Sequence, residues 1–345
     1  MSSPVISVRG LRKAYGSGAT AHQAVGGIDL EINRGEIFAF LGPNGAGKTT
    51  TVEILEGYRD RDAGETEVLG IDPADGDSRW RSRIGIVLQE CRMEPKLTVR
   101  ETLELYAGLY QRPREIDETI ELVGLGEKAN DRAESLSGGQ QRRLDVAVAL
   151  IGDAELLFLD EPTTGFDPGA RRQAWEVIAG LRDLGKTIFL TTHYMDEAQA
   201  LADRVAVIAD GAIVAQGTPD DLGGRATAAT EIRFARPVGV EPSELPTVVG
   251  SEWSSAGAGL VRANTVEPTE LLHRLTGWAL GRGVELRSLE VSRPSLEDIY
   301  LELTAAEGRE GARHAGGDHG RTDAGERVGE RGRTDAGERV GERSR

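Results

Sequence analysis

Cysteine is almost absent from this chain of 345 residues, which contains a single one, Cys91. One cysteine cannot form an internal disulfide, which agrees with a reducing compartment. Long apolar runs are also absent, since no stretch approaches the roughly twenty apolar residues that a membrane-spanning helix needs. The residues before Val5 lack the basic region and the apolar core of a secretory leader. The sequence therefore predicts a cytoplasmic protein.

A basic surface is lacking too, because the net charge is −16. Residues 307–345 hold nine acidic residues and nine arginines, so the whole negative charge lies on residues 1–306. Nucleic-acid binding requires a basic face, so we expect no nucleic-acid partner. The end of the chain is a repeat, since GRTDAGERVGER at 320–331 recurs at 332–343. Its only apolar side chains are valine and alanine, which predicts a disordered tail over 305–345.

The strongest motif is GPNGAGKT at 42–49, which matches the phosphate-loop pattern G-x-x-x-x-G-K-[ST]. The apolar run 37–41 before it is typical of a buried strand, and 50–55 is typical of the first turns of a helix. In that context glycines let backbone N–H groups face phosphate oxygens, and the helix presents its positive end. A glycine-rich turn with an incidental lysine is the alternative. The residues expected to bind ATP are Gly42, Pro43, Asn44, Gly45, Ala46, Gly47, Lys48, Thr49 and Thr50.

Two roles within that loop follow from side-chain chemistry. Lys48 is expected to reach the β- and γ-phosphates, and the Thr49 hydroxyl to bind Mg²⁺.

The segment LLFLDE at 156–161 would complete the site. Its apolar part predicts a strand buried on both faces, with Asp160 at the carboxyl end to hold the metal. Glu161 would polarise the attacking water, since phosphoryl transfer depends on positioning and charge neutralisation. A strand that ends in a polar turn is the alternative.

A phosphate loop and an acidic strand end would also fit a helicase, a kinase or a partition ATPase. The segment LSGGQ at 136–140 distinguishes between them. It opens a helical pattern that runs to Leu150, and Ser137 with two glycines makes a second anion-binding helix start. A plain helix N-cap would explain it as well. With all these motifs in order, residues 1 to about 222 resemble the ATP-binding subunit of ABC transporters.

The resemblance implies further roles. In that family LSGGQ of one subunit closes over ATP held by another, so Ser137, Gly139 and Gln140 would act on a partner chain. Tyr15 matches the aromatic residue that stacks on adenine. Gln89 matches the glutamine that senses Mg²⁺. The two remaining positions are Asp167, which matches the loop that communicates across the dimer, and His193, which matches the histidine that touches the γ-phosphate. Phe166 departs from the leucine that is more usual there.

The resemblance and the patterns together predict an α/β fold, with a P-loop NTPase core of the ABC-ATPase type. Residues 1–222 would form the nucleotide-binding domain, with a helical subdomain at about 91–150 that docks on the membrane subunit. Residues 230–304 predict a small α+β domain, ferredoxin-like, whose ending PSLEDIYLELT resembles the daunorubicin-resistance group of drug exporters. Its expected elements are strands at 231–235, 247–252, 259–263 and 284–291, and helices at 268–281 and 294–304 with Ser295 as cap.

The expected function is ATP hydrolysis, with ATP and Mg²⁺ as cofactors, that drives a separate integral membrane permease. We expect a homodimer or a pair with a related ATPase chain, held at the cytoplasmic face of the membrane through the permease. Export of a drug-like or lipophilic compound is the expected task. The alternative is a soluble regulatory or translation-associated ATPase of the same type. Those translation factors usually carry two cassettes on one chain, and this chain has one.

Overall fold

The computed structural model describes residues 4–18, 21–88, 93–222, 229–257, 259–293 and 297. Three parts of the sequence-based expectation therefore lie outside it. They are Gln89, the repeated tail, and all of the expected helix at 294–304 except Glu297. In the described part, no helix is long and apolar enough to cross a membrane.

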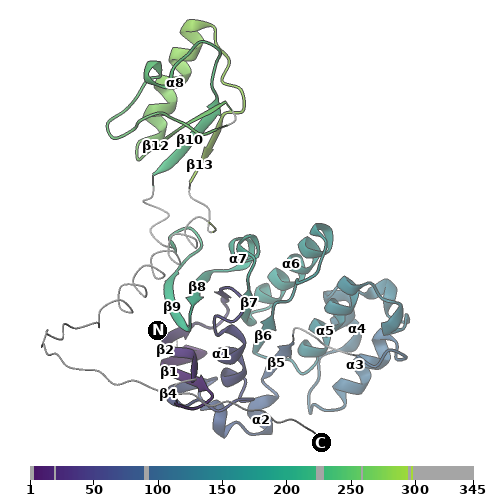
Figure 1. Ribbon diagram of the computed structural model, residues 1–345. Coiled ribbons are helices and arrows are strands. Elements are labelled where there is room, and N and C mark those ends of the chain that lie inside the picture. The colour runs from purple at the N-terminus through teal and green to yellow at the C-terminus, as the bar shows by residue number, and fades with distance from the viewer. Residues whose placement is uncertain are drawn as a thin grey trace, which may run out of the picture. The chain divides into compact units, whose positions relative to one another are not determined.

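A six-stranded sheet lies at the centre of the region up to residue 222 (Figure 1). Five of its strands are parallel, and the sixth, β9, runs antiparallel to β8 at one edge. Every residue of the central strands β6, β7 and β3 is buried and most are apolar, as expected of parallel strands covered on both faces. The spatial order is β5 (Ile84–Val87), β6 (Leu156–Asp160), β7 (Thr187–Thr192), β3 (Ile37–Leu41), β8 (Arg204–Ala209) and β9 (Ala212–Gly217).

Alternation along these strands divides the interior into two cores. Side chains such as Ala39, Leu159 and Leu190 pack on one face against the helices that lie between residues 99 and 201. Side chains such as Phe40, Phe158 and Phe189 pack on the other face. That second face is covered by α1 (Lys48–Leu55) and by an antiparallel sheet in the order β2 (His22–Ile32), β1 (Ile6–Tyr15) and β4 (Ala63–Val68). A four-residue helix, α2 (Ser78–Arg81), buries Trp80 in the same core.

The helical part between β5 and β6 contains α3 (Val99–Ala107), α4 (Ile116–Leu122) and α5 (Gly138–Leu150). Both α3 and α5 begin with a capping box, in which a hydroxyl and a Glu or Gln side chain satisfy backbone N–H groups reciprocally. The pairs are Thr98 with Glu101, and Ser137 with Gln140. Helices α6 (Pro168–Asp183) and α7 (Met195–Leu201) follow β6 and β7.

Residues 229–293 form a sheet with a core of its own. The order is β11 (Ser254–Ser255), β12 (Leu260–Thr265), β10 (Thr230–Ala235) and β13 (Glu290–Ser292), with every neighbouring pair antiparallel. Because β12 lies between them, β10 and β11 run parallel, which is the split arrangement of ferredoxin-like folds. Helix α8 (Pro268–Arg282) makes the second crossover. The segment 236–253 makes the first, with only a 3₁₀ turn at Pro242–Glu244 in place of a helix.

Of the strands expected in this part, the one at 247–252 is absent and the one at 284–291 is much shorter. Residues 247–252 form no strand, because Ser251 closes a turn onto Val248 and Gly250 has a left-handed φ of 77°. Their apolar side chains serve as anchors for the crossover segment, since Val248 and Trp253 are buried in its core. The expected strand at 284–291 is only Glu290–Ser292, because Ser288 with φ 55° interrupts the extended backbone.

Phe189 joins the aromatic side chains of the second core. Its ring centroid lies 5.9 Å from that of Phe38, 5.7 Å from Phe40 and 5.6 Å from Phe158. We expect Phe189→Ala to lower the free energy of unfolding by about 3–5 kcal/mol, because a large buried ring is lost and its cavity cannot collapse. Urea titration measures the change. Leu184→Ala, at a site 47% exposed, is the matched control and should change it by less than about 0.5 kcal/mol.

Candidate functional site

The carboxyl ends of three parallel strands meet at one edge of the central sheet. The register pairs Leu41 of β3 with Thr192 of β7, and Asp160 of β6 with Thr191 of β7. The phosphate loop, Glu161 and His193 follow directly after these strands, and Asp160 is the last residue of β6. Segments more than a hundred residues apart in sequence are thereby neighbours in space, as the crevice rule for open α/β sheets leads one to expect.

Two glycines of the phosphate loop are required by close packing. A Cβ on Gly42 would lie 2.4 Å from the Ile208 carbonyl oxygen. One on Gly47 would lie 2.2 Å from the Ala24 oxygen, and Gly47 has a φ of 104° that favours glycine. Helix α1 begins at the next residue, Lys48, so its N-terminal N–H groups open onto the loop. The loop and α1 therefore form an anion-binding start of the expected kind.

Three titratable side chains form a contact series beside this loop. The Glu161 Oε1 atom lies 3.5 Å from Lys48 Nζ and 3.2 Å from His193 Nδ1. The lysine ammonium also donates hydrogen bonds to the Gly42 and Pro43 carbonyls, at 2.7 and 3.1 Å. Burial alone would raise the pKa of Glu161, but His193 and Lys48 outweigh it and hold this pKa below its usual value. Glu161 is therefore a carboxylate at neutral pH and can accept a proton.

The backbone of Glu161 is left-handed, with φ 44°, which is uncommon for a residue with a side chain. Its N–H donates to the Thr191 carbonyl at 3.1 Å and lies 3.0 Å from the Thr191 hydroxyl. Thr164 donates its hydroxyl proton to Glu161 Oε2 at 3.1 Å. Such a conformation persists only where the surroundings enforce it, and it is common at active sites.

Asp160 is the second carboxylate at this edge, and it is buried. Burial and the neighbouring Glu161 raise its pKa, while the hydrogen bond donated by the Thr191 hydroxyl opposes that shift. With the Thr49 hydroxyl on α1, the site offers oxygen donors of the kind Mg²⁺ prefers. The chemistry of these residues therefore fits a magnesium ion.

A cavity of about 340 Å³ opens over the phosphate loop. Tyr15 at the end of β1 lines one side, and its hydroxyl lies 3.2 Å from Thr50 Oγ1. The Arg59 guanidinium lies 5.3 Å from the centre of the Tyr15 ring. The sequence indicated Tyr15 and the loop, but it did not indicate two further residues of the wall, His22 and Ala24. Glu161 completes the lining, so the Glu161 side chain, the phosphate loop and the Tyr15 ring face one cavity.

The LSGGQ residues are not among the described residues that line this cavity. Ser137 caps α5, accepting from the Gln140 N–H at 3.3 Å, and Gln140 Oε1 accepts from the Ser137 N–H at 2.9 Å. Ser137 is exposed, so this helix start faces outward. Asp167 caps α6 through the N–H groups of Gly169 and Ala170 at 2.8 and 3.0 Å. These residues sit apart from the chain's own phosphate loop.

Sequence reasoning missed Arg142, whose buried guanidinium donates to the Asp160 carbonyl at 2.8 Å and to the Pro162 carbonyl at 3.1 Å. Arg142 and Arg143 are adjacent in α5, and the helical pattern alone did not show which of them points inward. It also missed Thr191, because a threonine inside an apolar run gives no signal until its neighbours in the sheet are known.

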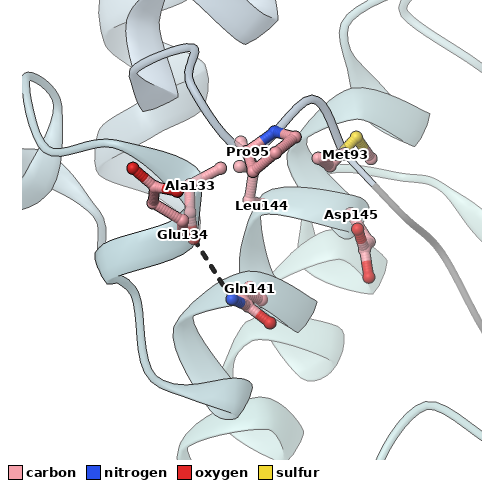
Figure 2. Close-up of a pocket in the computed structure, with 7 residues that line it drawn as sticks. All are labelled: Met93, Pro95, Ala133, Glu134, Gln141, Leu144 and Asp145. Atoms are coloured by element: carbon pink, nitrogen blue, oxygen red, sulfur yellow. Dashed lines mark hydrogen bonds between the residues drawn. The ribbon is translucent and has the colours of Figure 1, made fainter.

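A second hollow lies on the helical part, between α5 and the segments at 93–95 and 133–134 (Figure 2). Its volume is about 320 Å³. Two of its lining residues are joined by a hydrogen bond, which the Gln141 side chain donates to the Ala133 carbonyl at 3.1 Å. We call it the α5 groove, and it is lined by Met93, Pro95, Ala133, Glu134, Gln141, Leu144 and Asp145.

Comparison with known proteins agrees with this geometry. The family model of the ABC transporter matches residues 25–164, and that of the ABC transporter domain-containing protein-like, C-terminal domain matches residues 230–295. The dimeric structure of MJ0796, a bacterial ABC transporter cassette, is 27% identical with a TM-score of 0.55, covering 62% of this chain and 98% of that one. A post-hydrolysis dimer of the same cassette, bound to ADP and Pi, is 26% identical with a TM-score of 0.55, covering 62% and 98%.

Relatives match over nearly the whole length. The daunorubicin resistance ATP-binding protein DrrA3 of Streptomyces coeruleorubidus is 35% identical over 317 residues, covering 90% of this chain and 98% of that protein. The Nod factor export ATP-binding protein I of Ralstonia nicotianae is 37% identical, covering 90% and 96%. The linearmycin resistance ATP-binding protein LnrL of Bacillus subtilis is 33% identical, covering 87% and 98%.

A P-loop cassette with this site and these relatives defines an ATPase of the ABC type. The chain belongs to the ATP-binding proteins of ABC transporters, in their export-type systems. The expected family, fold class and enzyme activity are thus confirmed.

Glu56, at the end of α1, is 9% exposed and carries an unusual proton affinity. Burial, with Asp160 and Glu53 nearby, raises its pKa to about 8. The unfolded chain loses this proton near its ordinary pKa of 4.5, so the folded state binds more protons between those two values. Its stabilising contribution is therefore complete below about pH 4.5 and is lost as the pH rises towards 8.

We expect Glu56→Gln to stabilise the nucleotide-free chain at pH 8 by about 2–4 kcal/mol, because the amide cannot ionise. Near pH 5 the variant and the wild type should differ little. Denaturant titrations at both pH values measure the difference. Equal free-energy changes at the two pH values would contradict the buried-acid assignment.

Proposed function

We propose that this chain is the ATP-hydrolysing subunit of an exporter, and that two cassettes close head to tail over two ATP molecules. A separate integral membrane subunit would hold the pair at the cytoplasmic face of the membrane and carry the cargo. The observation that carries the proposal is the series Lys48, Glu161 and His193 beside a phosphate loop. Resistance to daunorubicin and to linearmycin in the relatives' names favours a drug-like or lipophilic cargo.

Binding is assigned to the loop and to Tyr15. The N–H groups of residues 42–50 would face the phosphates, the Lys48 ammonium would neutralise the β- and γ-phosphates, and the Tyr15 ring would stack on adenine. Thr49, Asp160 and Gln89 would hold Mg²⁺, which supplies charge neutralisation on the phosphates when bound. Lys48 lies 3.5 Å from Glu161. A γ-phosphate that binds Lys48 would therefore lie beside the Glu161 carboxylate.

Hydrolysis is assigned to Glu161 and His193. The ionised Glu161 carboxylate would orient a water and accept its proton as the water attacks the γ-phosphate in line. His193, 3.2 Å away, would fix that carboxylate and contact the γ-phosphate. The leaving ADP keeps the electron pair of the broken bond. Thr164 and Thr191 would hold the glutamate in place during this step.

The site of one chain is incomplete on this proposal. Ser137, Gly139 and Gln140 would cap ATP bound to the partner chain, as the exposed, positively polarised start of α5 allows. Asp167, at the start of α6, would contact the partner at the same time. The solved dimers of related cassettes support a paired arrangement.

We expect Glu161→Gln to bind ATP with an affinity near that of the wild type but to lose about 100-fold or more in kcat. The amide keeps the size of the side chain and cannot accept a proton. Phosphate release and equilibrium binding of a fluorescent ATP analogue measure the two quantities. Sizing with ATP should show the variant as an accumulated dimer, and turnover near the wild-type rate would refute the assignment.

We expect Ser137→Arg to abolish turnover while monomers still bind ATP, because the bulky cation blocks closure over the partner's nucleotide. Ser78→Arg, at the exposed start of α2, is the matched control and should retain activity. Mixing Ser137→Arg with Lys48→Ala tests sharing of the site directly. Each variant is inactive alone, but mixed pairs contain one intact site, so activity should return; its failure to return would argue against shared sites.

The α5 groove is proposed as the docking site for a short cytoplasmic helix of the membrane subunit. Glu134 is exposed and acidic, whereas Asp145 is buried beside Arg142, so the proposed helix places a basic side chain near Glu134 and apolar side chains in the groove. Its wall is α5, the helix that starts at Ser137. Docking would therefore act on the element that closes over the partner's ATP.

We expect Glu134→Arg to keep its ATPase activity in solution but to lose the multi-span membrane protein that the wild type captures from detergent-solubilised membranes. Charge reversal at the rim repels a basic helix, and Glu134 is exposed and is not among the described residues that line the cavity over the phosphate loop. Glu127→Arg, an exposed change outside the groove, should keep the partner. Equal recovery with both variants would contradict docking here.

A further inference from the structure

Arg142 connects three segments that are far apart in sequence. Its guanidinium donates from Nε to the Pro162 carbonyl at 3.1 Å and from Nη2 to the Asp160 carbonyl at 2.8 Å. Nη1 donates to the Leu88 carbonyl and lies 3.6 Å from Asp145 Oδ2. The residue is only 8% exposed. A buried cation is costly unless its donors are satisfied. The bonds to three backbone carbonyls meet that requirement and fix the position of the guanidinium.

Two of these carbonyls lie on either side of Glu161. The residue between them has the left-handed φ of 44°, which its own side chain does not favour. On the far side, Thr191 holds the Glu161 N–H. The peptide unit between Asp160 and Glu161 is therefore held by Arg142 from α5 and by Thr191 from β7, and Arg142 also holds the next carbonyl but one, that of Pro162.

From this geometry we propose that Arg142 is a positioning residue for hydrolysis, which holds the backbone around Glu161 so that its carboxylate faces the phosphate loop. The inference rests on the base role proposed for Glu161. Arg142 does not reach the nucleotide cavity, since it is not among the described residues that line it. It acts through the orientation of Glu161, and lysine cannot reproduce the grip because its single ammonium lacks the planar fork.

Arg143 provides a matched control on the same helix. Its guanidinium donates to the Gly124 carbonyl at 3.0 Å and to the Val123 carbonyl at 3.5 Å, within the helical part. The two arginines thus make similar bonds to backbone carbonyls, but only Arg142 bonds the segment that carries Glu161. A general loss of helix packing would affect both variants, whereas loss of positioning affects one.

The test compares Arg142→Lys and Arg142→Gln with Arg143→Lys and Arg143→Gln, each with and without Glu161→Gln. With Glu161 present, we expect the Arg142 variants to lose about 10- to 100-fold in kcat, as small misplacements of reacting groups do. Binding of a fluorescent ATP analogue should change less than about 2-fold, and the Arg143 variants should keep kcat within about 2-fold. Thermal unfolding confirms which variants are folded, and Arg142→Lys is the milder one.

The Glu161→Gln background separates positioning from other roles. Residual turnover there, followed in single-turnover assays over hours, should not fall further when Arg142 becomes Lys, because residues that act through one group are not additive. The same loss in both backgrounds, or unchanged kcat in Arg142→Lys, overturns the proposal. Failure of the double variant to form the ATP dimer overturns it too, since Arg142 would then act on LSGGQ. Normal turnover of Glu161→Gln alone instead overturns the base role.

Discussion

Parallel pairing of β6, β7 and β3 is the constraint on which the site depends. Parallel strands place all their carboxyl ends at one edge, and here the chain leaves each end with a different group: the phosphate loop, a pair of carboxylates and a histidine. The backbone strain of this arrangement lies at Glu161, whose left-handed backbone turns the chain sharply after β6. The bonds around it, from Thr191, Thr164 and Arg142, are what keep that turn in place.

Much of this site could be predicted from the sequence, because its parts lie at the ends of apolar runs. Each apolar run predicts a strand. The group that follows it, which is GPNGAGKT, the pair Asp160 and Glu161, or His193, is then placed at the end of that strand. Arg142 and Thr191 could not be predicted, because their roles are set by carbonyls and amides of other segments. A helical pattern places Arg142 on α5, but only the packed fold shows what its guanidinium meets.

The domain at 229–293 shows where pattern reasoning fails. A strand was expected at 247–252, yet a crossover that lacks a helix also needs apolar anchors. Val248 and Trp253 serve that purpose, and Phe234 meets Trp253 edge-on with centroids 5.2 Å apart. The buried positions there are Val248, Ser251 and Trp253, which do not alternate as in a strand, so the apolar content alone was misleading. The strands β10 and β12 were predicted well since each has a partner on both sides.

Helix α5 joins the proposed roles in one rigid element. Its start at Ser137 would meet the partner's ATP, its flank at Gln141 and Leu144 forms the α5 groove, and Arg142 between them grips the Glu161 segment. A helix of thirteen residues moves as a unit, because each turn is bonded to the next. A displacement at the groove would therefore reach both the LSGGQ residues and the Glu161 backbone. On this view, docking, closure and hydrolysis are coupled through the packing of a single helix rather than through a long series of contacts.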